Sequence, residues 1–103
     1  MSPKIEIPEQ AIAEFCRKWK IIEFSLFGSV LRDDFRPDSN VDVLVRFSPD
    51  AVHTLFDLVH MQDELRGLLG NEVDLVEKTA IERSRNYLRR KAILGTAEVV
   101  YAA

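Results

Sequence analysis

Apolar residues along the chain change between two spacings, one typical of helices and one typical of strands. Near the N-terminus they recur at helical spacing, which predicts an amphipathic helix that begins near Pro8. The apolar face of this helix consists of Ala11, Ile12, Phe15, Cys16 and Trp19. Residues 21–27 and 41–47 are short runs rich in β-branched and aromatic residues, and they predict two strands.

The segment between these two strands has the composition of turns. Gly28-Ser29 ends the first strand, residues 30–34 can form a short helix, and residues 36–39 have turn chemistry. The sequence therefore predicts a connection of turns and a short helix between the two strands.

The second half alternates helix and strand again. Thr54 and Asp57 resemble a capping pair that opens a helix, and Gly70 predicts its end. One face of this helix is traced by Leu55, Leu58, Val59, Gln62, Leu65 and Leu69. Residues 72–76 predict a third strand.

The last part of the chain predicts one long helix and an extended tail. Thr79 and Glu82 form a capping-box pattern, which predicts a helix from there to about Leu94, before Gly95. Residues 97–101 then predict an edge strand or a cover for the core. The whole order predicts an α/β (α+β) fold, a small mixed β-sheet flanked by helices, in one domain spanning residues 1–103.

Composition and charge narrow the class of protein. Hydrophobic residues make up 47% of the chain and the formal net charge is −3, which argues against general nucleic-acid binding while leaving a local basic patch open. The single Cys16 cannot form an internal disulfide and fits packing in a reducing compartment. With no apolar run long enough to span a bilayer and no signal-peptide core, we expect a cytoplasmic protein without membrane contacts.

Gly28-Ser29 is the first candidate for chemistry. Backbone N–H groups at a turn between strand and helix can bind a phosphate, glycine permits close approach, and the Ser29 hydroxyl can donate a hydrogen bond. A Gly-Ser pair is more often only a turn, so these two residues alone carry little weight.

The second candidate is a group of oxygen-bearing side chains on strands. Asn40 and Asp42 have the same parity on the second predicted strand, so they point the same way and can hold a hard cation such as magnesium. Asp74 interrupts the next apolar strand, and it would lie beside Asp42 if the two strands are neighbours. Solvated strand positions are the simpler interpretation of each residue taken alone. Together they favour phosphoryl or nucleotidyl transfer, in which metal ions neutralise phosphate oxygens and a carboxylate accepts a proton.

The spacing of these residues resembles a known family. Phe27-Gly28-Ser29, followed after ten residues by Asn40-Val41-Asp42, resembles the motif of the DNA polymerase beta superfamily of nucleotidyltransferases. Residues 26–32 and 37–45, including Arg32 and Ser39, are similar to the minimal nucleotidyltransferases of bacteria and archaea. Residues 72–76 and the ending at 99–101 extend the resemblance over nearly the whole chain.

The resemblance implies a nucleotidyltransferase fold and a set of roles. It implies a nucleotide site of Gly28, Ser29, Arg32 and Ser39, a magnesium site of Asn40, Asp42 and Asp74, and catalytic carboxylates Asp42 and Asp74. It also implies ATP and Mg²⁺ as cofactors and a partner, a HEPN-type ribonuclease toxin, to whose tyrosine AMP is transferred. The chain would then be the antitoxin, with no direct contact to nucleic acid.

Asn40 departs from the family pattern, which has aspartate there. A neutral amide in place of a carboxylate removes one negative charge from the metal site, so we expect impaired or absent transfer. Two explanations stay open: a natural antitoxin that has lost catalysis, or a substitution of the kind chosen to trap a nucleotide complex. Correspondingly, an antitoxin that only masks the toxin is the alternative function, and a small-molecule nucleotidyltransferase ranks last.

The predicted last helix is rich in cations. Arg83, Arg85, Arg89, Arg90 and Lys91 fit a solvated face with favourable charges near a helix C-terminus. The functional alternative is a contact for ATP phosphates or for an acidic partner surface. His53 and His60 have no partners at metal-ligand spacing, so we expect surface or partly packed histidines. For Tyr87 and Tyr101 packing is favoured over modification.

Overall fold

A four-stranded mixed sheet forms the centre of the molecule. The computed structural model describes residues 7–31, 36 and 39–103. The strands are β1 (Ile21–Phe27), β2 (Val41–Phe47), β3 (Val73–Glu77) and β4 (Glu98–Ala102), arranged in the order β3-β2-β1-β4. β1 is antiparallel to β2 and to β4, and β2 is parallel to β3. The predicted α/β class, both central strands and the edge strand at the C-terminus are confirmed.

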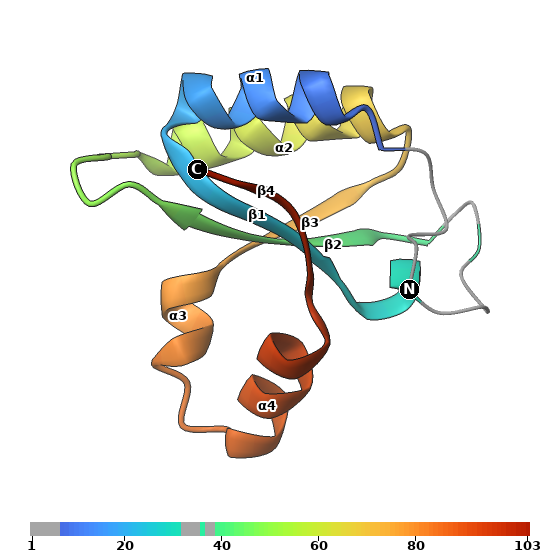
Figure 1. Ribbon diagram of the computed structural model, residues 1–103, viewed down its shortest axis with the longest axis vertical. Helices are drawn as coiled ribbons and strands as arrows, with labels where there is room; N and C mark the ends of the chain where they lie inside the picture. The colour runs from blue at the N-terminus through green and yellow to red at the C-terminus, as the bar shows by residue number, and fades with distance from the viewer. Residues whose placement is uncertain (1–6, 32–35, 37–38) are drawn as a thin grey trace.

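Helices cover the two faces of the sheet in separate pairs (Figure 1). α1 (Glu9–Trp19) and α2 (Leu55–Leu69) lie side by side on one face. α3 (Lys78–Glu82) and α4 (Tyr87–Thr96) lie against the other face. The short 3-10 helix η1 (Gly28–Leu31) follows β1 directly. It begins two residues before the predicted helix at 30–34, whose positions 32–34 fall outside the described residues.

The ends of α2 form as the sequence predicts. The Thr54 hydroxyl accepts a hydrogen bond from the Asp57 N–H at 3.2 Å, and the Asp57 carboxylate accepts one from the Thr54 N–H at 3.0 Å. This completes a capping box with aspartate in the place of the usual glutamate. Gly70 closes the helix in the left-handed region, at φ 78°.

The predicted buried face of α2 is partly wrong. Met61, Leu65 and Leu69 are buried, whereas Leu55 and Val59 are exposed. The helix carries apolar residues on more than one side, so their spacing alone does not fix which side meets the sheet.

The single helix predicted from Thr79 to Leu94 is also wrong, because the structure has two helices there. β3 continues through Glu77 straight into α3, so Thr79 lies inside the helix and caps nothing. The Ser84 hydroxyl accepts from the Asn86 N–H at 3.2 Å, and the Asn86 side chain accepts from the Arg89 N–H at 3.1 Å. These local hydrogen bonds replace helical ones and start α4 afresh. Gly95, the predicted stop, lies within α4.

The main apolar core lies between the sheet, η1, α1 and α2. Phe24 and Leu65 have no exposed surface, and Phe15 meets Phe24 edge to face at 6.4 Å between ring centroids. Cys16 belongs to this core, and burial raises the pKa of its thiol to about 12. The thiol is therefore an inert packing group, as the sequence indicated. A smaller cluster of Phe27, Leu44, Ile81 and Ile93 packs α3 and α4 against the opposite face.

His53 connects the layers at one end of the sheet. Its Nε2 lies 2.8 Å from the carbonyl oxygen of Trp19, and its ring packs on Phe47 at 4.6 Å between centroids. The prediction of a partly packed histidine is confirmed here. Across the described ranges, no helix combines the length and apolar character that crossing a bilayer requires.

Candidate functional site

Two carboxylates stand next to each other on the two parallel strands. Asp42 of β2 and Asp74 of β3 are register partners, so their side chains leave the same face of the sheet. Val73 and Leu75 point to the main core, while Val76 packs on the smaller cluster, which places Asp74 on the α3–α4 face. The predicted neighbourhood of Asp42 and Asp74 is confirmed. Charges of like sign held opposite each other repel, and a cation between them relieves the repulsion.

Gly28 approaches the same carboxylate from β1. Phe27, the preceding residue, is the register partner of Asp42 on the antiparallel side. Gly28 has φ 77°, and a Cβ atom at this position would lie 2.3 Å from Asp42 Oδ2. Both the backbone conformation and the space beside Asp42 therefore require glycine. This close approach explains why a glycine directly follows the strand.

Ser39 and Asn40 lead into β2 beside the carboxylates. The Ser39 N–H donates to the carbonyl oxygen of Arg36 at 2.9 Å, and the two residues between them in the predicted turn lie outside the described residues. The Asn71 side chain donates to the carbonyl oxygen of Ser39 at 3.3 Å, and the Val41 N–H donates to that of Glu72 at 2.8 Å. Asn40 lies between these anchored residues, and it is exposed. The backbone at the candidate metal position is thus held from the β3 side.

Of two predicted nucleotide contacts, one is described only in its backbone and the other is not described. The backbone of Ser29 lies in η1, directly after Gly28, but the hydroxyl role predicted for it concerns a side chain that the structure leaves undescribed. Arg32 falls outside the described residues altogether.

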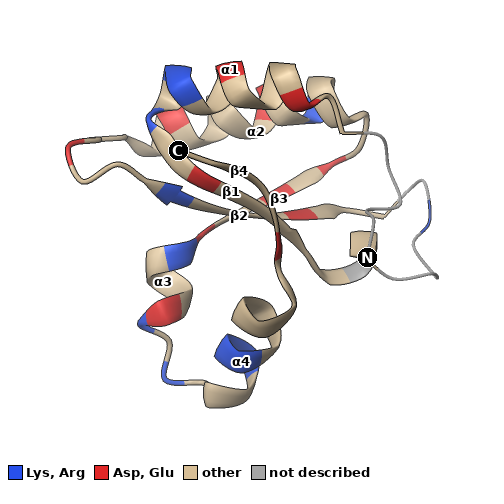
Figure 2. Ribbon diagram, in the orientation of Figure 1, with Lys and Arg blue, Asp and Glu red and all other residues tan. Residues whose placement is uncertain are grey.

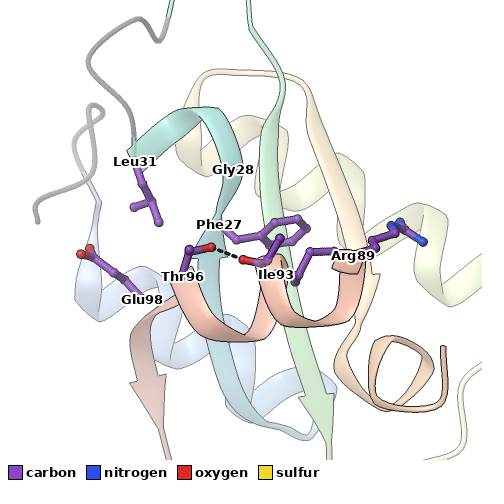
Figure 3. A pocket seen from close by; sticks show the side chains of 8 residues that line it. Phe27, Gly28, Leu31, Arg89, Ile93, Thr96 and Glu98 are labelled. Carbon is purple, nitrogen blue, oxygen red and sulfur yellow. Dashed lines mark hydrogen bonds between the residues drawn. The ribbon is translucent and has the colours of Figure 1, made fainter. Parts of the chain in front are cut away.

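A cavity of about 610 Å³ opens beside Gly28, between η1 and α4 (Figure 3). Its walls are mainly apolar, and they consist of Phe27, Gly28, Leu31, Arg89, Ala92, Ile93, Thr96 and Glu98. The Thr96 hydroxyl donates to the carbonyl oxygen of Ala92, within α4. Gly28 borders both this cavity and the carboxylate pair, although Asp42 and Asp74 are not part of the cavity wall.

The sequence did not reveal the contribution of α4 to this cavity. Because the helix was predicted to end at Leu94, Thr96 and Glu98 were expected beyond it and were not assigned to any site. Neither residue carries a motif signal. α4 brings Thr96 to the cavity, and the pairing of β4 with β1 places Glu98 opposite Leu26, two residues before Gly28.

The donor atoms fit a hard cation with fewer charges than the family motif supplies. Asp42 and Asp74 offer carboxylate oxygens from neighbouring strands, and Asn40 offers a neutral carbonyl oxygen. Within the described part of the chain, no three side chains of His, Cys, Asp or Glu gather into a metal site. This agrees with the asparagine at position 40, which leaves a pair of acids where the motif has three.

Paired acids beside a glycine turn, on one face of a mixed sheet, define a protein of the nucleotidyl-transfer class. The chain belongs to the nucleotidyltransferase domain family, whose model matches residues 8–97. It is 33% identical over 69 residues to the protein adenylyltransferase MntA of Thermococcus cleftensis, an alignment that covers 67% of this chain and 68% of MntA.

Solved structures agree with the family. A protein assigned as a minimal nucleotidyltransferase superposes with a TM-score of 0.66 at 32% identity, over 87% of this chain and 86% of that one. A chain from the complex of a tri-AMPylated Shewanella oneidensis HEPN toxin with its MNT antitoxin has the same fold, with a TM-score of 0.60 at 20% identity. That match covers 92% of this chain and 70% of the other. The mixed sheet with helices on both faces is therefore the nucleotidyltransferase fold.

Proposed function

We propose that this chain is a nucleotidyltransferase-type antitoxin that transfers AMP from ATP to a tyrosine of a HEPN-type toxin. The register pairing of Asp42 with Asp74 beside Gly28 is the observation that carries the proposal. Its relatives supply the direction, since one is named a protein adenylyltransferase and a structural neighbour is an antitoxin bound to an AMPylated toxin. A protein that uses ATP in this way would work in the cytoplasm.

The transfer needs few covalent steps from the protein. The tyrosine oxygen attacks the α-phosphorus of ATP, the bond from that phosphorus to the oxygen bridging to the β-phosphate breaks, and pyrophosphate leaves. The phenolic proton passes to a carboxylate, for which Asp74 is placed because it is exposed on the α3–α4 face. Gly28 and Ser29 would hold the triphosphate through backbone N–H groups, with Arg32 and Ser39 beside them.

Asn40, Asp42 and Asp74 are the residues that would hold Mg²⁺. The ion would supply positive charge for the phosphate oxygens and lower the pKa of the attacking hydroxyl. Asp42 would be the central ligand, since it lies between Gly28 and Asp74. Asn40 would contribute a weaker, uncharged contact, so we expect slow transfer by this chain.

Asn40 also favours a second function, in which the chain neutralises the toxin by binding alone. The fold around position 40 is intact, with its neighbours hydrogen-bonded to the β3 side. A chain with this site could therefore keep its shape while its chemistry is lost.

The mass of the toxin distinguishes the two functions. The protein encoded by the neighbouring open reading frame, which we expect to be a HEPN toxin, is incubated with the chain, ATP and MgCl₂, and its intact mass is followed over time. We expect addition of AMP, slow with the native chain and about 10²-fold faster with Asn40→Asp. The same reaction with Asp42→Asn is the control and should add none.

The outcomes separate cleanly. If Asn40→Asp leaves the toxin unmodified while the native chain still inhibits it, the transfer proposal fails and masking is supported. If neither variant modifies or inhibits the toxin, both functions fail.

A further inference from the structure

Charge is distributed very unevenly along the chain. Residues 78–97, which contain α3 and α4, include six Lys and Arg residues and one Glu. The rest of the chain has eight Lys and Arg residues against sixteen Asp and Glu residues. Figure 2 shows the result, with cations gathered on the helices below the sheet. We call residues 78–97 the basic lobe.

Two of the six cations in the basic lobe are engaged within or near it. Lys78 pairs with Glu23 of β1, and the Arg90 guanidinium donates to the carbonyl oxygen of Ser84 at 2.7 Å. Arg83, Arg85, Arg89 and Lys91 are exposed and form no ion pair with any described residue. The lobe's only acid, Glu82, forms an ion pair with Arg46 of β2, with 2.6 Å between nitrogen and oxygen. A cluster of uncompensated positive charge therefore stands on an acidic protein.

The break between α3 and α4 removes the simple explanation for all of these cations except Arg83, which lies at the C-cap of α3. In one continuous helix they would lie near the C-terminus, where the helix dipole favours them. Instead, Arg89 and Arg90 lie in the first turn of α4, where the dipole opposes positive charge. α4 has no acidic residue in that turn. The placement costs local stability, which a role in binding would account for.

The cluster is continuous with the site. Arg89 lines the cavity that opens beside Gly28, and Figure 3 shows it at the end of the cavity opposite Glu98. Two apolar residues stand among the cations, Tyr87 with 58% and Leu88 with 76% of its surface exposed. Arginine and aromatic residues are both enriched at protein interfaces. A toxin that brings a tyrosine to Asp74 would cover the surface that adjoins this cavity.

We propose that the basic lobe, with Arg85, Lys91, Tyr87 and Leu88 at its surface, docks an acidic surface of the acceptor protein. This inference rests on the proposed function, because it assigns the partner's charge and where it binds. RNA is the other class of polyanion, and two observations oppose it. The Tyr87 ring is already covered by the Arg90 guanidinium, 5.5 Å from its centroid, which leaves that ring face closed to base stacking. The acidic remainder of the chain would also repel a longer phosphate backbone.

Binding without ATP tests the docking surface separately from catalysis. The double variant Arg85→Glu/Lys91→Glu changes two exposed residues outside the cavity wall. The control, Arg17→Glu/Lys18→Glu on α1, makes the same change in net charge on the other face of the sheet, and it also removes the exposed Lys18–Glu64 ion pair. Association with the HEPN toxin expected from the neighbouring open reading frame is measured by surface plasmon resonance at low and high salt. We expect the first variant to slow association about tenfold and to lose most of its salt dependence, and the control to stay within about twofold.

A zero-length carbodiimide crosslink tests the contact directly. Lys91 is the lobe's only lysine outside the Lys78–Glu23 pair, so its amine should join a carboxylate of the toxin in the complex. Lys91→Arg keeps the charge and should keep the affinity, yet lose this crosslink.

The binding and crosslinking experiments test the docking surface independently of whether AMP is transferred. Equal slowing by both double variants, or a complex without a Lys91 crosslink, overturns it. So does a labelled single-stranded RNA that binds the native chain and not Arg85→Glu/Lys91→Glu while toxin binding is unchanged. A toxin that docks on this lobe but gains no AMP would instead refute transfer and keep the docking surface.

Discussion

The apolar cluster between the sheet, η1, α1 and α2 contains fifteen buried residues of the described chain, whereas the cluster under α3 and α4 contains four. The first face carries almost no chemistry. The second carries the Asp42–Asp74 pair, the cavity beside Gly28 and the basic lobe. Stability and function are thus divided between the two faces, and a thin cover over the second leaves room for a nucleotide and for a partner.

The two faces should differ most in the free energy of unfolding that is lost when a buried side chain of each cluster is truncated. Ile12→Ala removes a side chain with no exposed surface from the larger cluster, and we expect a loss of about 4 kcal/mol in the free energy of unfolding. Ile93→Ala in the smaller cluster should cost about 2 kcal/mol, because solvent can fill part of the space beside the cavity. Urea denaturation of both variants measures the two values. Equal losses would show that the faces are not energetically different.

Removing an acid should have the reverse effect, with little change in stability and a large loss of activity. We expect Asp74→Asn, in an Asn40→Asp background, to slow AMP transfer about 10²-fold. The free energy of unfolding should rise by a few tenths of a kcal/mol, because a charge opposite Asp42 is gone. Toxin mass and urea denaturation provide the two readouts.

The control for that variant lies on the same strand. Glu77→Gln removes an exposed acid at the end of β3 with the opposite parity, and it should leave transfer unchanged. A similar loss of transfer from both variants would mean that overall charge, and not position 74, matters.

Two glycines test the close contact beside Asp42. Gly28 and Gly70 have nearly the same φ, 77° and 78°, but a Cβ at Gly70 would meet nothing within 4 Å. Gly70→Ala should therefore cost only the left-handed strain, about 1 kcal/mol. Gly28→Ala should cost about 2 kcal/mol and weaken ATP binding as well, because the new methyl group displaces the Asp42 carboxylate. Thermal unfolding with and without ATP compares them, and equal costs would remove the argument that Asp42 requires this glycine.

The same division explains what the sequence could and could not predict. The strands at 21–27 and 41–47 and the capping of α2 follow from local composition, and the structure confirms them. The neighbourhood of Asp42 and Asp74 could be stated only as a condition. Alternation along strands fixes which side chains share a face, but the pairing of β2 with β3 comes from the structure. The break at 83–86 was missed, since Thr79 with Glu82 has the pattern of a helix start but lies inside α3. The Asn86 cap that starts α4 is a local signal, but the pattern at 79–82 concealed it. The cavity also requires α4 to lie near Gly28, which no local pattern specifies.

Alanine substitution of a helical glycine should have the smallest effect on stability, and in α4 the effect should be local. Gly95 lies inside α4 and Gly67 inside α2, and a Cβ at either would meet nothing within 4 Å. Alanine at each should stabilise its helix by about 0.5–1 kcal/mol. Because α2 packs on the larger core, it should open only when the whole protein unfolds, so Gly67→Ala should raise the free energy of global unfolding. α4 rests on the smaller cluster, so Gly95→Ala should mainly slow hydrogen exchange of the α4 amides. Equal slowing across all elements in both variants would show that α4 opens together with the core, and that the two faces form one cooperative unit.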